Sequence, residues 1–301
     1  MKKILRKLLF RNLTPKPFFG VNIPYGEIRE HVFLANGDQR MDISDQHNVV
    51  CQTPFSIVIW LNSNQLKNSL EKNPRLFVMK GEKILANVSL SLIQSFKENT
   101  GSFFVFKIAS IRSYKPGILK RYLMLRYFFS NEKLPFFEAK AYSAIYSYPR
   151  KVIITSFRDK DYYNMFPMDF QGTYAEANIY VLGLKTSNIT LDRIIRAGRV
   201  VVSSTDQIDT KTVYELGAHH SKEPPQIDQL PFETKNSETF GFPVPGFSTT
   251  YRELEIIGHH ILGSHCMLIG RIANTKLISE NRSALYHVHI FQFPGSGYKE
   301  V

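Results

Sequence analysis

The sequence has little cysteine and no long apolar run. Its two cysteines, Cys51 and Cys266, form neither a CxxC pair nor a disulfide framework, which favours a reducing, cytoplasmic location. Without a run of about 18 apolar residues, no transmembrane helix is expected. The chain of 301 residues is 43% hydrophobic and 21% charged. This is the composition of a globular protein, and it excludes disordered, collagen-like and coiled-coil classes.

Positive charge is concentrated in the first half of the chain. Residues 1–149 hold 22 Lys and Arg against 10 Asp and Glu, whereas residues 150–301 hold 16 of each kind. A protein that was basic throughout in order to bind nucleic acid would not divide its charge in this way. Nucleic acid is therefore not an expected partner.

The chain opens with MKKILRKLLFRNL, in which basic and apolar side chains fall on roughly opposite faces of a helix. Two interpretations stay open. The helix lies peripherally on anionic lipid or an acidic partner, or it packs Leu8 and Phe10 on its own protein. The apolar part is too short for a secretory signal, and no cleavage site follows it.

Short strand-like segments dominate the rest of the chain. They are 31–35, 55–61, 75–79, 103–111, 136–146, 151–157, 178–184, 199–203, 251–257, 265–273 and 284–293, and short helices are expected at 65–72, 190–197 and 210–217. This pattern predicts a mainly β fold of barrel or sandwich type with short helices. No GxGxxG or GxxxxGK[ST] follows a strand, so nucleotide binding of the Rossmann or P-loop type is not supported.

The order of these elements repeats along the chain. Apolar strands end in polar turns at 61–64 and again at 184–188, and each turn is followed at equal spacing by a short helix, a basic residue and the next strand. A second match joins 130–138 with 279–287, where a polar turn precedes an aromatic-rich strand in both.

Two copies of one fold explain this repetition. The copies would cover 1–147 and 148–301, with the excess length of the second copy in 206–248, a segment rich in Pro, Gly and polar residues. Chance similarity between two β domains is the competing explanation.

Polar groups gather in the second copy. The segment 157–172 is predicted to be a long turn, stiffened by Pro167, that lies close to a strand edge. The residues it places there are Asn164, Met165, Phe166 and Met168.

A strand-to-helix junction follows. Gly183 allows another group to approach the strand backbone closely. The residues after Gly183 supply hydroxyls, a lysine and free backbone amides, which suit the binding of a phosphate. The alternative is a plain helix cap at Asn188 or Thr190. The junction consists of Lys185, Thr186, Ser187, Asn188 and Thr190.

A histidine opens one of the last strands, in the sequence Gly263-Ser264-His265. At a strand start His265 can point into a cleft, where it would bind a cofactor or polarise a substrate. The alternative is a surface histidine without a functional role, whose ring nitrogens have ordinary hydrogen-bond partners.

Three of these segments together resemble the flavin reductase-like FMN-binding split barrels. They are 164–168, 185–188 with Thr190, and 263–265 with Ile269-Gly270, and the resemblance covers about 150–293. The sequence departs from the family where FPMDFQG replaces a segment rich in Ser and Thr, and where Ser264 replaces an Asp. The first copy departs further, with Phe103 in place of the histidine and no lysine in its turn at 62–64.

The resemblance implies two tandem split β-barrels that form a pseudo-dimer within one chain, or a homodimer. It also implies bound FMN, with NAD(P)H or another donor supplying hydride or electrons. The junction 185–190 would hold the phosphate, the 164–168 segment would line the ring beside Gly183, and His265 would act at the reacting face. The basic first copy would shape the pocket without a flavin of its own and attract the anionic cofactor.

Other functions remain as alternatives. A flavin-binding or scaffold protein without turnover is favoured by the altered FPMDFQG segment. His287 and His289 would face the same side of a strand, as two metal ligands do, but no acidic or sulfur ligand stands at a recognisable spacing and no metal is expected. The sequence contains no GxSxG or Ser-His-Asp pattern that would support a hydrolase.

Overall fold

The computed structural model describes residues 18–36, 39–65, 74–112, 117–118, 122, 135–206, 208–280, 283–290, 292–293 and 295–301. The predicted N-terminal helix and nearly all of the predicted helix at 65–72 lie outside these residues. Within the described ranges, no helix has both the length and the apolar character needed to span a membrane.

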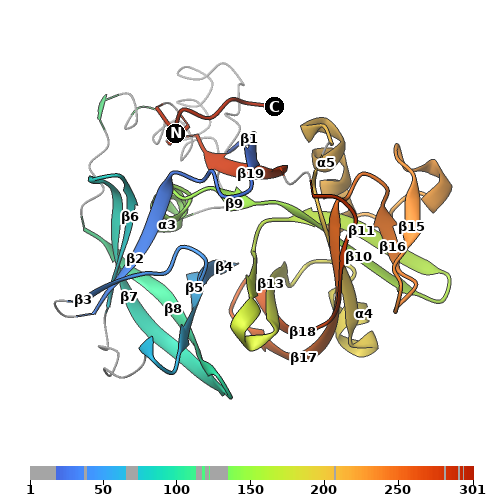
Figure 1. The fold of residues 1–301 in the computed structure, drawn as a ribbon, viewed down its shortest axis with the longest axis horizontal. Helices are drawn as coiled ribbons and strands as arrows, with labels where there is room; N and C mark the ends of the chain where they lie inside the picture. Colours follow the sequence, from blue (N-terminus) through green and yellow to red (C-terminus); the bar gives the residue numbers. More distant parts are fainter. Residues whose placement is uncertain are drawn as a thin grey trace, which may run out of the picture.

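Two seven-stranded antiparallel sheets make up most of the described chain (Figure 1). The first sheet has the order β3-β2-β6-β7-β8-β5-β4. Its strands are β2 (Glu30–Asn36), β3 (Gln39–Asp42), β4 (His47–Gln52), β5 (Phe55–Asn62), β6 (Arg75–Lys80), β7 (Lys83–Glu98) and β8 (Gly101–Ile111). The β-branched and aromatic side chains of β5 are buried on both faces of the sheet, which explains its continuous apolar sequence.

The second sheet has the order β11-β10-β14-β17-β18-β13-β12. Its strands are β10 (Ile153–Asp159), β11 (Tyr162–Met168), β12 (Gln171–Tyr174), β13 (Ile179–Lys185), β14 (Arg199–Ser204), β17 (Thr250–Ile261) and β18 (His265–Leu277). When the seven strands of each sheet are numbered in chain order, the two sheets have the same spatial order of strands. Thus β2 corresponds to β10, β5 to β13 and β8 to β18.

This shared strand order confirms the prediction of a mainly β chain that contains one fold twice. The extra length of the second copy lies at 205–249, between β14 and β17, where the first copy has a two-residue turn at 81–82. The boundaries 1–147 and 148–301 stay a prediction, because strands from both halves share a third sheet.

The third sheet joins the two ends of the described chain. It has the order β1-β19-β9 and consists of β1 (Phe18–Pro24), β19 (Ser283–His289) and β9 (Arg150–Lys151). Strand β1 pairs with β19 over its full length, from Phe18 opposite His289 to Pro24 opposite Ser283. Strand β1 comes early in the chain, but its place in the fold depends on pairing with β19, the last strand.

The predicted helices at 190–197 and 210–217 are confirmed as α4 (Leu191–Ala197) and α5 (Thr210–Leu216). The Asp209 carboxylate caps α5 by accepting a 2.8 Å hydrogen bond from the backbone N of Thr212. Gly198 ends α4 with a φ of 65°, a conformation that glycine adopts without strain. The rest of the inserted segment forms η3 (Gly217–His220), η4 (Ile227–Gln229), β15 (Thr234–Asn236) and β16 (Pro243–Pro245), and η2 (Ala175–Ala177) precedes β13.

The prediction of a strand at 136–146 is wrong, because this segment forms helix α3 (Phe136–Ile145). Its apolar residues run almost continuously, and periodicity cannot distinguish such a segment from a buried strand. Ala139, Ala141 and Ala144 favour the helix and are all buried. The proposed match between 130–138 and 279–287 is therefore also wrong, since the second segment leads into strand β19 and the first into α3.

The prediction of one long turn at 157–172 is likewise wrong. Strands β10 and β11 form a hairpin whose tight turn contains Lys160 with a φ of 52°. Strand β11 lies at the edge of its sheet, so Pro167 is tolerated there although it lacks an N–H donor.

A shared core joins the two copies into an intrachain pseudo-dimer. Val50, Trp60 and Phe103 of the first copy pack with Val181 and Met267 of the second in one buried hydrophobic cluster. Strand β4 crosses this boundary and lies against β12, β13 and β18. The boundary thus has the apolar character of a domain interior.

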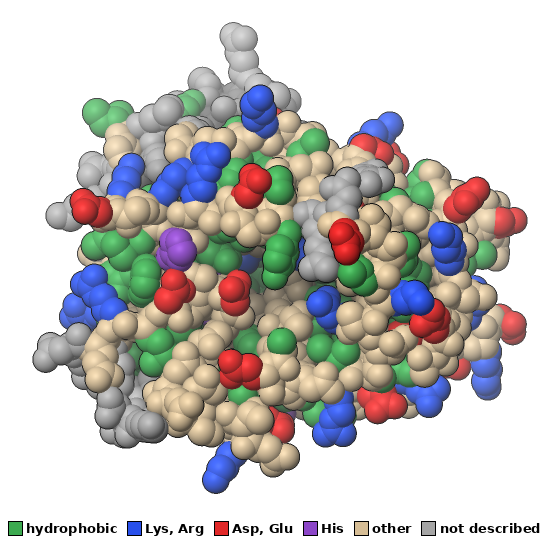
Figure 2. Space-filling view, viewed as in Figure 1, with side chains coloured by type: hydrophobic (Ala, Val, Ile, Leu, Met, Phe, Trp, Pro, Cys, Tyr) green, Lys and Arg blue, Asp and Glu red, His purple; other side chains and the backbone are tan. Residues whose placement is uncertain are grey.

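Much of the positive surplus of the first half lies outside the described residues. The segments 1–17 and 113–134 contain 11 of its 22 basic residues. On the face shown in Figure 2, acidic and basic side chains of the described residues are interspersed. The described part of this face is therefore not a single basic patch.

Candidate functional site

The predicted phosphate corner lies at the end of β13, where the chain leaves the second sheet for α4. Lys185, Thr186 and Ser187 are exposed there. Lys185 lies directly opposite His265, the first residue of β18. An ammonium group with two hydroxyls has the donor chemistry that a phosphate requires.

The backbone amides of Thr186, Asn188 and Thr190 already have acceptors, which differs from the expectation of free N–H groups at this corner. The N of Thr186 donates to the Ser264 carbonyl oxygen at 3.1 Å, and the N of Asn188 donates to that of Lys185 at 2.9 Å. The Thr186 hydroxyl also donates to the Ser264 oxygen, at 3.3 Å. An anion at this corner would therefore be held mainly by side chains.

Asn188 and Thr190 are buried and hold the corner in its shape. Oδ1 of Asn188 accepts from the backbone N of Thr190 at 2.8 Å, and Nδ2 donates to Nδ1 of His220 at 2.8 Å. Oγ1 of Thr190 accepts from Nδ2 of Asn164 at 2.6 Å. These two residues position the corner, and their predicted contact with a phosphate stays a prediction.

The inserted segment contributes His220 to this corner. Nε2 of His220 donates to the carbonyl oxygen of Pro167 at 3.0 Å while Nδ1 accepts from Asn188, so one neutral tautomer satisfies both bonds. Burial lowers the pKa of His220, and the charge of Lys185 acts in the same direction. The insertion thus packs along β11 through a histidine that stays neutral at pH 7.

His265 is buried beside this corner. Its Nδ1 accepts from the backbone N of Gln52 at 3.4 Å and lies 2.9 Å from Oγ of Ser264, so the proton is on Nε2. Burial, followed by the charge of Lys185, lowers the pKa of His265 to about 4. The Phe170 ring packs on the imidazole with centroids 4.9 Å apart. Ser264 therefore orients His265 without the carboxylate that the family pattern contains.

The 164–168 segment forms strand β11, and its first three side chains point into the interior. Asn164, Met165 and Phe166 are fully buried, and Met165 and Phe166 belong to two different hydrophobic clusters. Pro167 is partly exposed and Met168 is 7% exposed. The side chains of Asn164, Met165 and Phe166 thus pack in the interior, and contact of the segment 164–168 with a flavin ring stays a prediction.

Gly183 does permit a close approach, but the approaching group is protein. A Cβ at Gly183 would lie 2.5 Å from the carbonyl oxygen of Val50 in the first copy. The residue therefore belongs to the boundary between the copies. In the first copy, ladder register places Gly101 opposite Asn62, as His265 lies opposite Lys185.

A buried Asp–His pair lies close to these residues and was not predicted. Oδ2 of Asp169 accepts from Nδ1 of His287 at 2.8 Å and from the hydroxyl of Tyr146 at 2.9 Å. Burial raises the pKa of Asp169, but these hydrogen bonds outweigh it and lower the pKa below its usual value. The two residues are 118 positions apart, and no sequence pattern connects them. Over the described ranges, no three His, Cys, Asp or Glu residues are grouped as a metal site would require.

Comparison with known proteins finds similarity to solved structures. No family model matches the chain, and no curated protein matches it. About half of the chain is similar in fold to FMN-binding proteins and flavin reductases. The expected resemblance is thus confirmed as a likeness of fold.

Three solved structures illustrate it. The FMN-binding protein from Thermus thermophilus with bound 1-cyclohex-2-enone is 19% identical with a TM-score of 0.42, over 51% of this chain and 86% of that chain. The flavin reductase PheA2 is 12% identical with a TM-score of 0.42, over 54% and 96%. The flavin reductase HpaC complexed with NADP+ is 16% identical with a TM-score of 0.42, over 54% and 97%.

Proposed function

We propose that the second copy binds FMN and that the chain is an FMN-dependent oxidoreductase of flavin reductase type. The observation that carries the proposal is the exposed corner of Lys185, Thr186 and Ser187 next to a neutral, oriented His265. The corner offers a cation and hydroxyls to a phosphate, and the histidine offers an Nε2–H donor beside it.

The donor chemistry of these residues fits the anionic end of FMN. Lys185, Thr186 and Ser187 would hold the phosphate, while Asn188 and Thr190 keep the corner in place. When bound, FMN would supply the ring that takes up hydride or electrons from NAD(P)H or another donor and passes them on. Ser264 fixes the His265 imidazole, so that its Nε2–H is held ready for a hydrogen bond to ligand.

A flavin-binding or scaffold protein without turnover is the second candidate. It is favoured by the burial of Asn164, Met165 and Phe166, which leaves Pro167 and Met168 as the partly accessible side chains of the predicted ring-lining strand.

The visible spectrum of the purified full-length chain tests the proposal. We expect the chain to be yellow, or to become yellow with added FMN at no more than one flavin per chain, and to be bleached by NADH or NADPH without oxygen. A yellow chain that neither nucleotide bleaches supports the carrier. A chain that takes up no FMN, or that binds two per chain, contradicts the proposal.

A further inference from the structure

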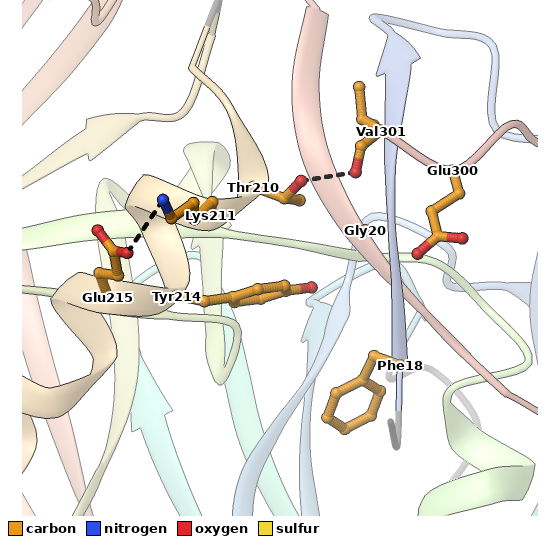
Figure 3. Close-up of a pocket in the computed structure, with 8 residues that line it drawn as sticks. All are labelled: Phe18, Gly20, Thr210, Lys211, Tyr214, Glu215, Glu300 and Val301. Carbon is orange, nitrogen blue, oxygen red and sulfur yellow. Dashed lines mark hydrogen bonds and ion pairs between the residues drawn. The ribbon is translucent and has the colours of Figure 1, made fainter. Parts of the chain in front are cut away.

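A pocket of about 380 Å³ lies between α5 and β1, where the inserted segment meets the first strand of the described chain (Figure 3). None of its lining residues belongs to the corner proposed for FMN. Its volume is at the lower end of the range for small-molecule sites. The pocket is lined by Phe18, Gly20, Thr210, Lys211, Tyr214, Glu215, Glu300 and Val301.

Two aromatic rings give this pocket its apolar surface. Phe18 extends from β1 and Tyr214 from α5 (Figure 3). Both rings stack on the imidazole of His287, with centroid distances of 5.0 Å for Phe18 and 5.8 Å for Tyr214 and interplanar angles of 12° and 29°. His287 therefore lies directly behind the pocket, and a planar aromatic ligand would extend the same stack.

One nitrogen of His287 is engaged and the other is not. Nδ1 donates to the Asp169 carboxylate, which is ionised and can only accept. Nε2 is buried and has no hydrogen-bond partner among the described residues. A buried polar atom without a hydrogen-bond partner destabilises the fold. In the neutral imidazole Nε2 is an acceptor, so the partner it requires is a hydrogen-bond donor such as a hydroxyl.

We propose that this pocket binds a phenol whose ring stacks on Phe18 and Tyr214 and whose hydroxyl donates to Nε2 of His287. Tyr214 is 42% exposed, and turning of its ring toward solvent gives the hydroxyl access to Nε2. The site does not depend on flavin binding.

Titration with p-nitrophenol, in the absence of flavin, tests this proposal on the full-length chain. The absorption band of this compound moves to longer wavelength when its hydroxyl donates a hydrogen bond to a strong acceptor, so it reports both binding and the contact with Nε2. We expect saturable binding with a red shift. His287→Gln should abolish the red shift and weaken binding about tenfold or more, as the loss of one such hydrogen bond does. Tyr214→Ala should weaken binding severalfold but keep the red shift, because it removes one stacking surface and leaves Nε2 accessible.

The chain contains a matched control. Nδ1 of His31 and Oδ2 of Asp42 form the same pair at 3.0 Å, but their side chains are 53% and 45% exposed. His31→Gln should change neither binding nor shift. The proposal is overturned if p-nitrophenol does not bind, or if the red shift survives in His287→Gln. If His287→Gln does not fold, nitrogen NMR of the natural chain decides, and an Nε2 resonance of His287 that does not move on titration overturns the proposal.

Discussion

The side-chain amide of Asn188 donates a 2.8 Å hydrogen bond to Nδ1 of His220, and this bond ties the inserted segment to the corner after β13. The same imidazole donates from Nε2 to the Pro167 carbonyl on β11. Nearby, Nδ1 of His219 donates to the carbonyl oxygen of Met165. The insertion is therefore fastened along β11 at its two adjacent histidines, next to the proposed phosphate site.

Replacing the amide of this contact should destabilise the fold. Asn188→Ala leaves the backbone N of Thr190 and Nδ1 of His220 without their partners, and we expect a loss of about 1–3 kcal/mol in the free energy of unfolding. Urea denaturation measures it. Ser187→Ala, at the exposed neighbouring position, should change stability by less than about 0.5 kcal/mol. Equal effects of the two substitutions would mean that the Asn188 contacts carry no stability.

Lys185 should determine the affinity for FMN. Lys185→Ala removes the only cation that the proposed phosphate corner contributes from 185–190, and we expect binding to weaken by about 1–3 kcal/mol. Fluorescence titration with FMN gives the affinity. Lys235→Ala makes the same charge change on an exposed strand of the insertion and should leave the affinity unchanged. An unaltered affinity in Lys185→Ala would remove the assignment.

Stability should fall in mild acid because of His47. Its Nε2 accepts from the buried guanidinium of Arg150 at 2.9 Å, and burial, followed by the charge of Arg150, lowers the pKa of His47 to about 3. The unfolded chain takes up this proton near pH 6.5, so the contribution of His47 is complete above that pH and is lost as the pH falls toward 3. At pH 5 the loss is about 2 kcal/mol. Urea denaturation at pH 7 and pH 5 should show a smaller difference for His47→Gln than for the natural chain, whereas His31→Gln should retain the full difference.

The contact between the copies should not tolerate a methyl group at Gly183. Gly183→Ala places a Cβ 2.5 Å from the oxygen and 2.9 Å from the Cα of Val50, which are backbone atoms that cannot rotate away. We expect a destabilisation of about 1–3 kcal/mol, measured by thermal unfolding. At Gly258, on β17, the nearest atom to a new Cβ is 3.9 Å away, so Gly258→Ala should be nearly neutral. A Gly183→Ala chain as stable as Gly258→Ala would show that the copies can separate at this point.

Local sequence patterns predicted most of the strands because β-branched and aromatic runs were bounded by turn residues. They also located α4 and α5, whose polar caps and periodicity agree. They failed at α3, where Ala139, Ala141 and Ala144 are buried and the apolar residues run almost continuously, so that no clear period indicates a helix. They failed again at β11, where Pro167 suggested a turn although an edge strand accommodates it.

The candidate site was predictable only in its local part. Lys185, Thr186 and Ser187 follow one strand, and their exposure at its end agrees with the sequence. His220 reaches the corner from an insertion, and Asp169 meets His287 across 118 residues, so neither neighbour has a local signal. The burial of Asn188 and Thr190 also depends on tertiary packing, because a turn with these residues is equally compatible with an open cap.

The pairing of β1 with β19 also affects how the chain matures. During synthesis Phe18 leaves the ribosome long before His289, its ladder partner, has been translated. Throughout that interval β1 carries an unpaired edge, which is a template for wrong association. The sheet that β1 begins therefore closes only after the last strand of the described chain has been made.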